Sequence, residues 1–289
     1  MSRFDLAAFS DAVADIAEKA APLTACFRTR HGRTATAFHW GDGFYVAAEE
    51  AVDPDGELEL TLASGETMSV ELIGRDPSTG IALLKPKDAA APVLEKADPV
   101  RPGHLVVATG RDNASPLAVL GTVGEVGPAW RSLHGGTIDR RINLAAMTGG
   151  RFEGGPVLDA RGALVGMLLF GPRRRALVIP HETIERTVAT LRSKGHVSRG
   201  YLGAGLHPIR HGDVRGAIVM SLDEEGPAKA AGIVLGDIVT AWNGEAVRGP
   251  RELIRKLGPD SAGATVTLGV LHGGEARDVA ITIGERPLI

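Results

Sequence analysis

Short runs of apolar and β-branched residues, separated by turn residues, fill most of the first two thirds of the chain. Glycine, proline and aspartate mark the joints between the runs. Regularly spaced short strands of this kind favour an antiparallel barrel or sandwich over alternating strands and helices. The expected strands cover residues 33–39, 43–48, 58–62, 68–73, 81–85, 105–109, 117–126, 156–158, 164–170 and 176–179.

Two segments follow a helical period instead. Residues 9–20 place Phe9, Val13 and Ile16 on one face, and Pro22 ends the pattern. Residues 181–194 repeat the spacing with Ile184, Val188 and Leu191, and the glycine that follows fits a helix C-terminal stop.

The pattern changes again near residue 199, where strands and short helices alternate. Strands are expected at 217–221, 238–242, 265–271 and 278–283, and helices near 227–231 and 250–257. We therefore predict an N-terminal helix over 1–22, a β-barrel domain over 23–196 and a small α+β domain over 197–289.

The amino-acid composition of the chain argues against some classes of protein. Of 289 residues, 44% are apolar, which is enough for a sizeable core. A net charge of −3 and a pI near 6.3 argue against a nucleic-acid-binding surface. The basic run at 173–175 is interpreted as a solvated hairpin turn, and the lone Cys26 as a buried small hydrophobe.

The N-terminus lacks the apolar core of a secretory signal, and the apolar run at 164–170 is too short to span a bilayer. These features predict a cytoplasmic protein with no membrane partner.

A long run in the second domain resembles the PDZ domains of HtrA proteases. It covers residues 225–244, EGPAKAAGIVLGDIVTAWNG, and upstream RGYLGA at 199–204 resembles the family's carboxylate-binding loop. The resemblance implies that a peptide C-terminus binds here, because consecutive N–H groups in a glycine-containing loop can hold a carboxylate and the next strand edge can pair with the peptide. The implied peptide-binding residues are Tyr201, Leu202, Gly203, Ala204, Leu206, Ile254 and Leu257.

The N-terminal part resembles the HtrA trypsin-like serine protease domain, which implies a double antiparallel β-barrel. Three segments carry the likeness: GFYVAAEEAV at 43–52, RDPSTGIALLK at 75–85 and GRFEGGPVLD at 150–159. Where the family has its catalytic His, Asp and Ser, this chain has Glu50, Gly80 and Glu153.

These replacements predict that the chain is not an enzyme, because a carboxylate cannot form the usual acyl ester and glycine cannot orient a base. The expected function is then a protein-binding scaffold or adaptor, or a regulatory subunit of another enzyme. The alternative is an active HtrA-like serine endopeptidase whose triad is non-standard or lies elsewhere.

The former catalytic position allows three interpretations. Glu50 and Glu153 could hold a cation together, Glu153 could plug the oxyanion hole, or both could be solvated, which we favour. No metal site or cofactor is expected, since the nine histidines lack metal-ligand spacing. The expected partner is a protein bound by the PDZ domain. HtrA relatives also commonly form trimers, for which Phe4 and Phe9 are candidate contacts.

Overall fold

The computed structural model describes residues 5–29, 32–53, 56–87, 92–145, 150–172, 175–212 and 214–287. Phe4, Arg173 and Arg174, which carry two of the interpretations above, lie outside these ranges. The chain forms two compact units, one of residues 1–130 and 137–197, the other of residues 131–136 and 198–289.

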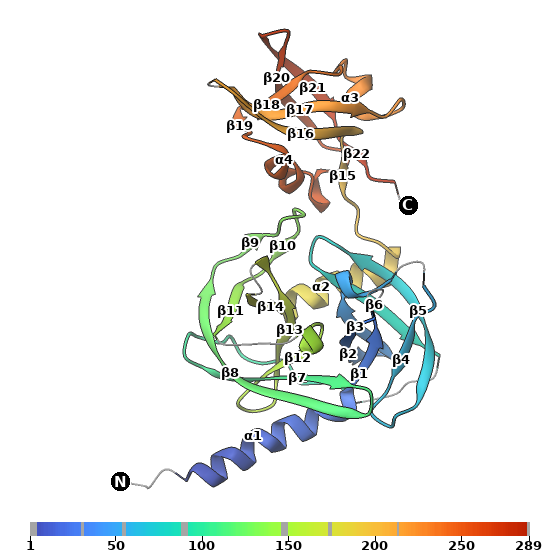
Figure 1. Cartoon of the computed structure of the whole chain (residues 1–289), viewed down its shortest axis with the longest axis vertical. Helices are drawn as coiled ribbons and strands as arrows, with labels where there is room; N and C mark the ends of the chain where they lie inside the picture. The colour runs from blue at the N-terminus through green and yellow to red at the C-terminus, as the bar shows by residue number, and fades with distance from the viewer. Residues whose placement is uncertain are drawn as a thin grey trace. The chain divides into compact units, whose positions relative to one another are not determined.

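The first unit contains two closed antiparallel barrels (Figure 1). The strands of the first barrel follow the order β1-β2-β3-β6-β5-β4. Their bounds are β1 Thr24–Arg28, β2 Thr34–Gly41, β3 Phe44–Ala48, β4 Glu59–Thr61, β5 Thr67–Asp76 and β6 Ile81–Pro86.

The second barrel has the order β11-β14-β13-β12-β7-β8. Its strands are β7 Leu105–Asp112, β8 Ser115–Gly127, β11 Arg141–Ala145, β12 Pro156–Asp159, β13 Leu164–Phe170 and β14 Ala176–Pro180. A two-stranded ribbon of β9 (Trp130–Arg131) and β10 (Thr137–Ile138) lies between β8 and β11 in the sequence.

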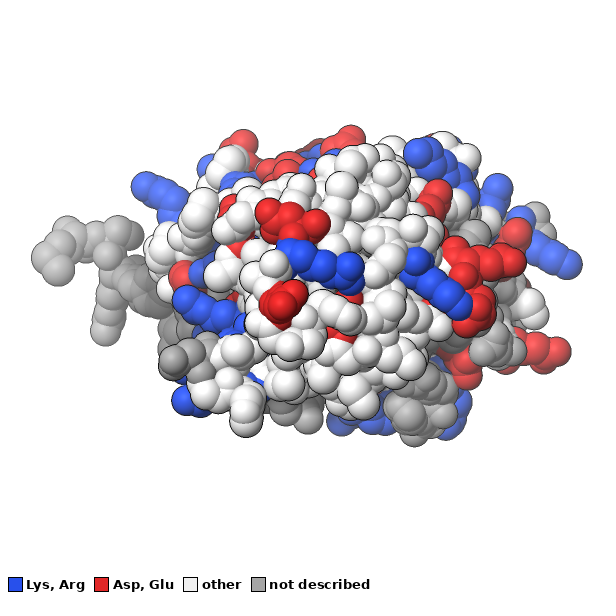
Figure 2. Space-filling view, turned by 90° about the horizontal axis from the view of Figure 1, so that it is seen from above, with Lys and Arg blue, Asp and Glu red and all other residues white. Residues whose placement is uncertain are grey.

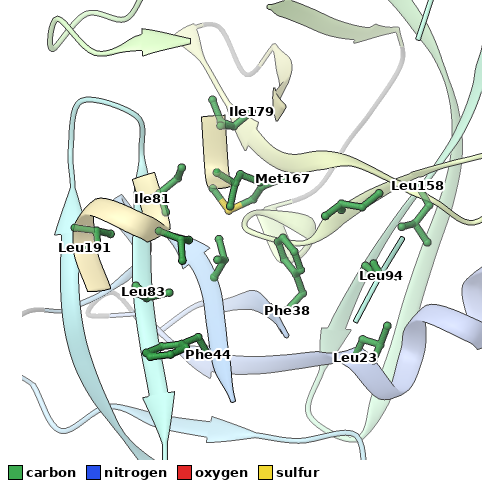
Figure 3. Packing of buried hydrophobic residues seen from close by; sticks show 14 of the residues in the cluster. Leu23, Phe38, Phe44, Ile81, Leu83, Leu94, Leu158, Met167, Ile179 and Leu191 are labelled. Carbon is green, nitrogen blue, oxygen red and sulfur yellow. The ribbon is translucent and has the colours of Figure 1, made fainter. Parts of the chain in front are cut away.

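Buried side chains hold the two barrels together. Each barrel has its own apolar cluster, and a third cluster takes residues from both. Figure 3 shows this shared cluster, where Phe38 and Leu83 from the first barrel meet Met167 from the second. All three are fully buried, so the barrels pack as one body.

Two helices complete the first unit. Helix α1 (Leu6–Ala20) begins at Asp5, whose carboxylate accepts hydrogen bonds from the N–H groups of Ala7 and Ala8. Helix α2 (His181–Lys194) has the bounds that its apolar spacing predicts and ends at Gly195, whose φ is 74°. Its apolar face is buried in the shared cluster.

The second unit is an α+β domain built on one sheet of order β16-β17-β18-β20-β21, with β19 beside β18. The strands are β16 Ala204–His211, β17 Val214–Leu222, β18 Ile238–Trp242, β19 Glu245–Ala246, β20 Thr265–His272 and β21 Glu275–Thr282; β15 Gly200–Tyr201 pairs separately with β22 Gly284–Glu285. The domain also contains helices α3 (Pro227–Ala230) and α4 (Pro250–Lys256). Its core is one cluster of buried apolar side chains.

The expected fold class is confirmed in its architecture: a mainly β chain with a double antiparallel β-barrel followed by an α+β domain. On the face seen in Figure 2, acidic and basic side chains are scattered among uncharged residues.

Within the described ranges, no helix combines the length and the apolar character needed to span a bilayer.

Candidate functional site

A cleft of about 940 Å³ opens on the first unit. It contains two of the three positions that correspond to a trypsin-like triad, Glu50 and Glu153. The described residues that line it are Thr29, Gly32, Arg33, Thr34, Ala35, Glu49, Glu50, Ala51, Val52, Arg75, Asp112, Gly150, Arg151 and Glu153.

Local turns place these groups. Glu49 and Glu50 lie in a short 3-10 helix (Glu49–Ala51) directly after β3, and the N–H of Glu49 donates to the C=O of Gly80 at 2.9 Å. Gly80 therefore contacts this 3-10 helix through its backbone carbonyl, and it does not itself line the cleft. The structure thus brings Glu50 and Glu153 to one cleft and leaves Gly80 outside its lining.

Glu153 follows a second 3-10 helix, Gly150–Phe152. Its N–H donates to the C=O of Gly150 at 3.1 Å, and its C=O accepts from the N–H of Thr36 at 2.9 Å. The N–H that would help to stabilise an oxyanion in a serine protease is therefore engaged inside the turn.

Ion pairs bring both signs of charge into the cleft. Arg75 pairs with Glu49 at 3.3 Å, and Arg151 pairs with Asp112 at 2.8 Å. Glu50 is exposed and has no hydrogen-bond or ion-pair partner among the described residues. The cleft is consequently polar, with a carboxylate at Glu50 that is free to meet water or a substrate.

The described lining contains no serine, cysteine or histidine. It contains two hydroxyl groups, on Thr29 and Thr34, and Thr34 Oγ1 donates to Asp112 at 3.3 Å. Among the described residues, no group of three His, Cys, Asp or Glu side chains could hold a metal ion.

Sequence reasoning missed Arg33, Arg75 and Asp112 as cleft residues. Each belongs to a different segment of the first unit, and only barrel closure brings them together. Nothing in the sequence around these residues distinguishes them from other surface arginines and aspartates, so they could not be predicted as cleft residues.

In the second unit, the edge strand β16 and helix α4 lie in contact. Of the sequence-predicted residues, Tyr201 ends β15, Leu202 and Gly203 connect it to β16, and Ala204 and Leu206 lie on β16. Leu206 and Leu257 pack against the domain core, while the side chain of Ile254 on α4 is 38% exposed.

Two backbone N–H groups in that connection have no acceptor within the described part of the chain. Leu202 and Gly203 are buried, and no described residue accepts a hydrogen bond from the N–H of either. Their carbonyls are both used, by the N–H groups of Ala228 and Asp223. Adjacent backbone N–H groups without a partner can hold an anionic acceptor such as a carboxylate.

A buried carboxylate supports this domain from inside the fold. Burial alone would raise the pKa of Asp237, but hydrogen bonds from His272, the Val234 N–H and Arg277 outweigh it and hold the pKa below its usual value.

In the first unit, burial raises the pKa of the Cys26 thiol, which is 3% exposed and packs as the sequence predicts.

Comparison with known proteins matches both units. Residues 35–167 match the trypsin-like peptidase domain family and residues 200–283 match the PDZ domain family. A probable periplasmic serine endoprotease, DegP-like, of Brucella suis is 34% identical over 266 residues, covering 85% of this chain and 51% of the relative. The chain is of the HtrA type.

Other members give the same result. The DegP-like relative of Bartonella henselae is 30% identical over 265 residues, covering 85% of this chain and 52% of its own length. The serine endoprotease from Yersinia pestis has the same fold, with a TM-score of 0.69 at 22% identity over 95% of this chain and 98% of that one. This HtrA-type chain spans about half the length of the curated relatives it matches.

Two expectations are corrected by these names. The expectation that this HtrA-type chain is not an enzyme is wrong, because its relatives are named serine endoproteases and the likeness runs through both domains. The expectation of a cytoplasmic protein is also wrong, because the same relatives are named periplasmic. The first expectation rested on three replaced side chains and the second on the N-terminal residues.

Proposed function

We propose that this chain is a periplasmic HtrA-type endopeptidase with a non-standard catalytic group. In this proposal the PDZ domain captures a protein by its C-terminal end, and the first unit hydrolyses peptide bonds in the cleft of Glu50 and Glu153. The two steps use different units and are tested separately.

The observation that carries the capture step is the pair of unpaired N–H groups of Leu202 and Gly203. A terminal carboxylate would accept from both, and hydrogen bonds to a charged acceptor are about twice as strong as neutral ones. The free edge of β16 would pair with the peptide backbone beside this anchor.

Apolar side chains beside the loop define the expected last residue of the peptide. Ala204, Leu206 and Leu257 are partly buried against the core, and Ile254 is partly exposed on α4. An apolar terminal side chain would cover them. Solved structures of the HtrA-type protease AlgW, described with a decapeptide and with a tripeptide, have this fold at TM-scores of 0.68 and 0.64.

Matched peptides test the capture step. A decapeptide ending in leucine with a free carboxylate is titrated into the full chain, beside the same peptide ending in a carboxamide. We expect the acid to bind at least about tenfold more tightly, because the amide loses the charge that the loop would bind. Equal affinities, or no binding of either peptide, would contradict the capture step.

The hydrolysis step rests on the relatives' names and on the chemistry of the cleft. A carboxylate can act as a general base toward water, and a second carboxyl group can donate a proton to the leaving amine. Glu50 is exposed in the cleft and is the proposed base; Glu153 is the proposed partner. This chemistry requires no acyl ester on residue 153.

Casein hydrolysis by the full chain tests this step. We expect cleavage that a serine-directed fluorophosphonate does not inhibit, since the described cleft holds no serine. Inhibition by that reagent would contradict the carboxylate mechanism, and absence of any cleavage would contradict the proposed activity.

A further inference from the structure

Strand β2 of the first barrel, strand β7 of the second barrel and the 3-10 helix Gly150–Phe152 all contact one another. Thr36 of β2 lies where the three segments meet, and its side chain is fully buried. Buried hydroxyl groups are almost always hydrogen-bonded, and a hydroxyl can donate and accept at the same time. The hydroxyl of Thr36 can therefore join the other two segments.

The Thr36 side chain uses both capacities. Its Oγ1 donates to the C=O of Arg151 at 2.7 Å and accepts from the backbone N–H of Arg111 on β7 at 3.1 Å. Because a carbonyl only accepts and an amide N–H only donates, the hydroxyl proton points to Arg151. Branching at Cβ restricts the side-chain rotamers of threonine, so this direction is fixed.

Thr36 also binds the turn through its backbone. Its N–H donates to the C=O of Glu153 at 2.9 Å. The carbonyls of Arg151 and Glu153, two residues apart, are thus both held by one residue. Two bonds fix the orientation of the turn that carries Glu153, whereas the backbone bond alone would let the turn pivot about one contact.

The packing around the hydroxyl is tight. A Cβ built on Gly110 of β7 would lie 3.0 Å from Thr36 Oγ1 and 3.2 Å from the carbonyl oxygen of Arg151. A methyl carbon stays at least about 3.3 Å from a carbonyl oxygen. A methyl group in place of the hydroxyl would therefore displace the carbonyl of Arg151, which now lies 2.7 Å from Oγ1.

The Arg111 side of this junction is anchored as well. Arg111 is 2% exposed, and its guanidinium donates to the carbonyls of Ala21, Thr24 and Ala114. The N–H that donates to Thr36 thus belongs to a residue whose side chain is held at three points.

We propose that Thr36 is a positioning residue for Glu153 and acts through its hydroxyl group. The inference rests on the proposed hydrolysis step, in which Glu153 works with Glu50. Thr36 does not line the cleft, so it acts through the turn and not on the substrate. Displacing a catalytic group by about 1 Å can lower the rate about 100-fold, which gives the second bond to the turn its value.

Three variants of the full chain test the proposal in hydrolysis of a fluorogenic casein-derived peptide. Thr36→Val removes the hydroxyl, and Thr36→Ser keeps it. Thr109→Val is the matched control, because Thr109 is also a buried strand threonine but its hydroxyl contacts the C=O of Pro156 at 3.5 Å. Thr36→Val should lower kcat about 10- to 100-fold with KM within about twofold, while the other two keep kcat within about threefold of the wild type.

Hydrogen exchange of the backbone amides of residues 151–154, followed by mass spectrometry, gives a second readout that needs no activity. Exchange should be at least about tenfold faster in Thr36→Val than in the wild type, because the turn loses one of its two bonds to Thr36. It should be unchanged in Thr36→Ser and in Thr109→Val. If Thr36→Val does not fold, Thr36→Ala, which lacks both the hydroxyl and the extra methyl, replaces it in both measurements.

Wild-type exchange or undiminished kcat in the variant without the hydroxyl would overturn the inference, as would a Thr36→Ser variant that loses as much as Thr36→Val. If neither hydroxyl-free variant folds, the hydroxyl serves stability and the inference also fails. A wild-type chain that does not cleave the peptide would contradict the proposed hydrolysis step, and the exchange comparison would then decide separately whether Thr36 holds the turn.

Discussion

The N–H of Thr36 on β2 donates to the C=O of Glu153 at 2.9 Å. This bond joins a strand of the first barrel to the turn that follows the 3-10 helix Gly150–Phe152 and precedes β12 of the second barrel. The backbone of Glu153 is thus positioned in the cleft by a hydrogen bond from a strand that is distant in sequence. The next residue, Gly154, has φ +81°, and a Cβ built there would lie 2.2 Å from the C=O oxygen of Thr36. The turn tolerates no side chain at this position.

Gly154→Ala should therefore destabilise the first unit by more than about 3 kcal/mol, since a strained backbone and a backbone overlap add together. Gly103→Ala is the control: its φ is +89°, but no atom lies within 4 Å of the added Cβ. It should cost about 1 kcal/mol. Urea unfolding of both variants measures the difference, and equal losses would show that the close approach to Thr36 is not rigid.

Ile254→Ala should weaken binding of a leucine-ended peptide. The side chain is 38% exposed on α4, and loss of its contact with the ligand would cost about 1 kcal/mol, or about fivefold in Kd. Val234→Ala is a matched control at another partly exposed aliphatic position, 43% exposed. Calorimetry with both variants should show the loss only for Ile254→Ala. Unchanged binding would show that Ile254 does not contact the peptide.

Asp237 should make the PDZ domain lose stability in acid. Its pKa is lowered in the folded state, because the hydrogen bonds from His272, Val234 N–H and Arg277 outweigh the effect of burial. The folded state then binds fewer protons than the unfolded one, so the stabilisation is present above the ordinary carboxyl pKa, near about 4, and is lost as the pH falls through the lower folded-state value.

Urea unfolding followed between pH 7 and pH 3 measures this dependence. Asp237→Asn should be less stable at pH 7 by about 1–3 kcal/mol and should lose less on acidification. Asp278→Asn, at an exposed position, should follow the wild type. An acid dependence that persists undiminished in Asp237→Asn would assign it to other groups.

The fold could be predicted from the sequence because local and long-range signals agreed. Apolar spacing at Ile184, Val188 and Leu191 defined a helix whose buried face the structure confirms, and the glycine after it takes the left-handed conformation expected of a C-terminal stop. The two family resemblances supplied the barrel closure that period-two patterns alone cannot specify.

The sites were less accessible to sequence reasoning. Pro208 could be seen in the sequence, but its place on a sheet edge follows from the pairing of β16 with β17 alone, which no local pattern indicates. Arg111 illustrates the same limit: it is 2% exposed and donates to the carbonyls of Ala21, Thr24 and Ala114, a role that an arginine in a strand does not suggest. Burial lowers its pKa.

The proposed mechanism depends on the cleft carboxylates. The most direct measurement is casein hydrolysis by the full chain beside Glu50→Gln and Glu153→Gln, with Glu66→Gln, at an exposed turn, as the control. We expect cleavage by the wild type and by the control, and a loss of about 100-fold or more in each cleft variant, in line with the usual contribution of general acid–base catalysis. Cleavage that survives both cleft substitutions, or a wild-type chain that does not cleave at all, would contradict it.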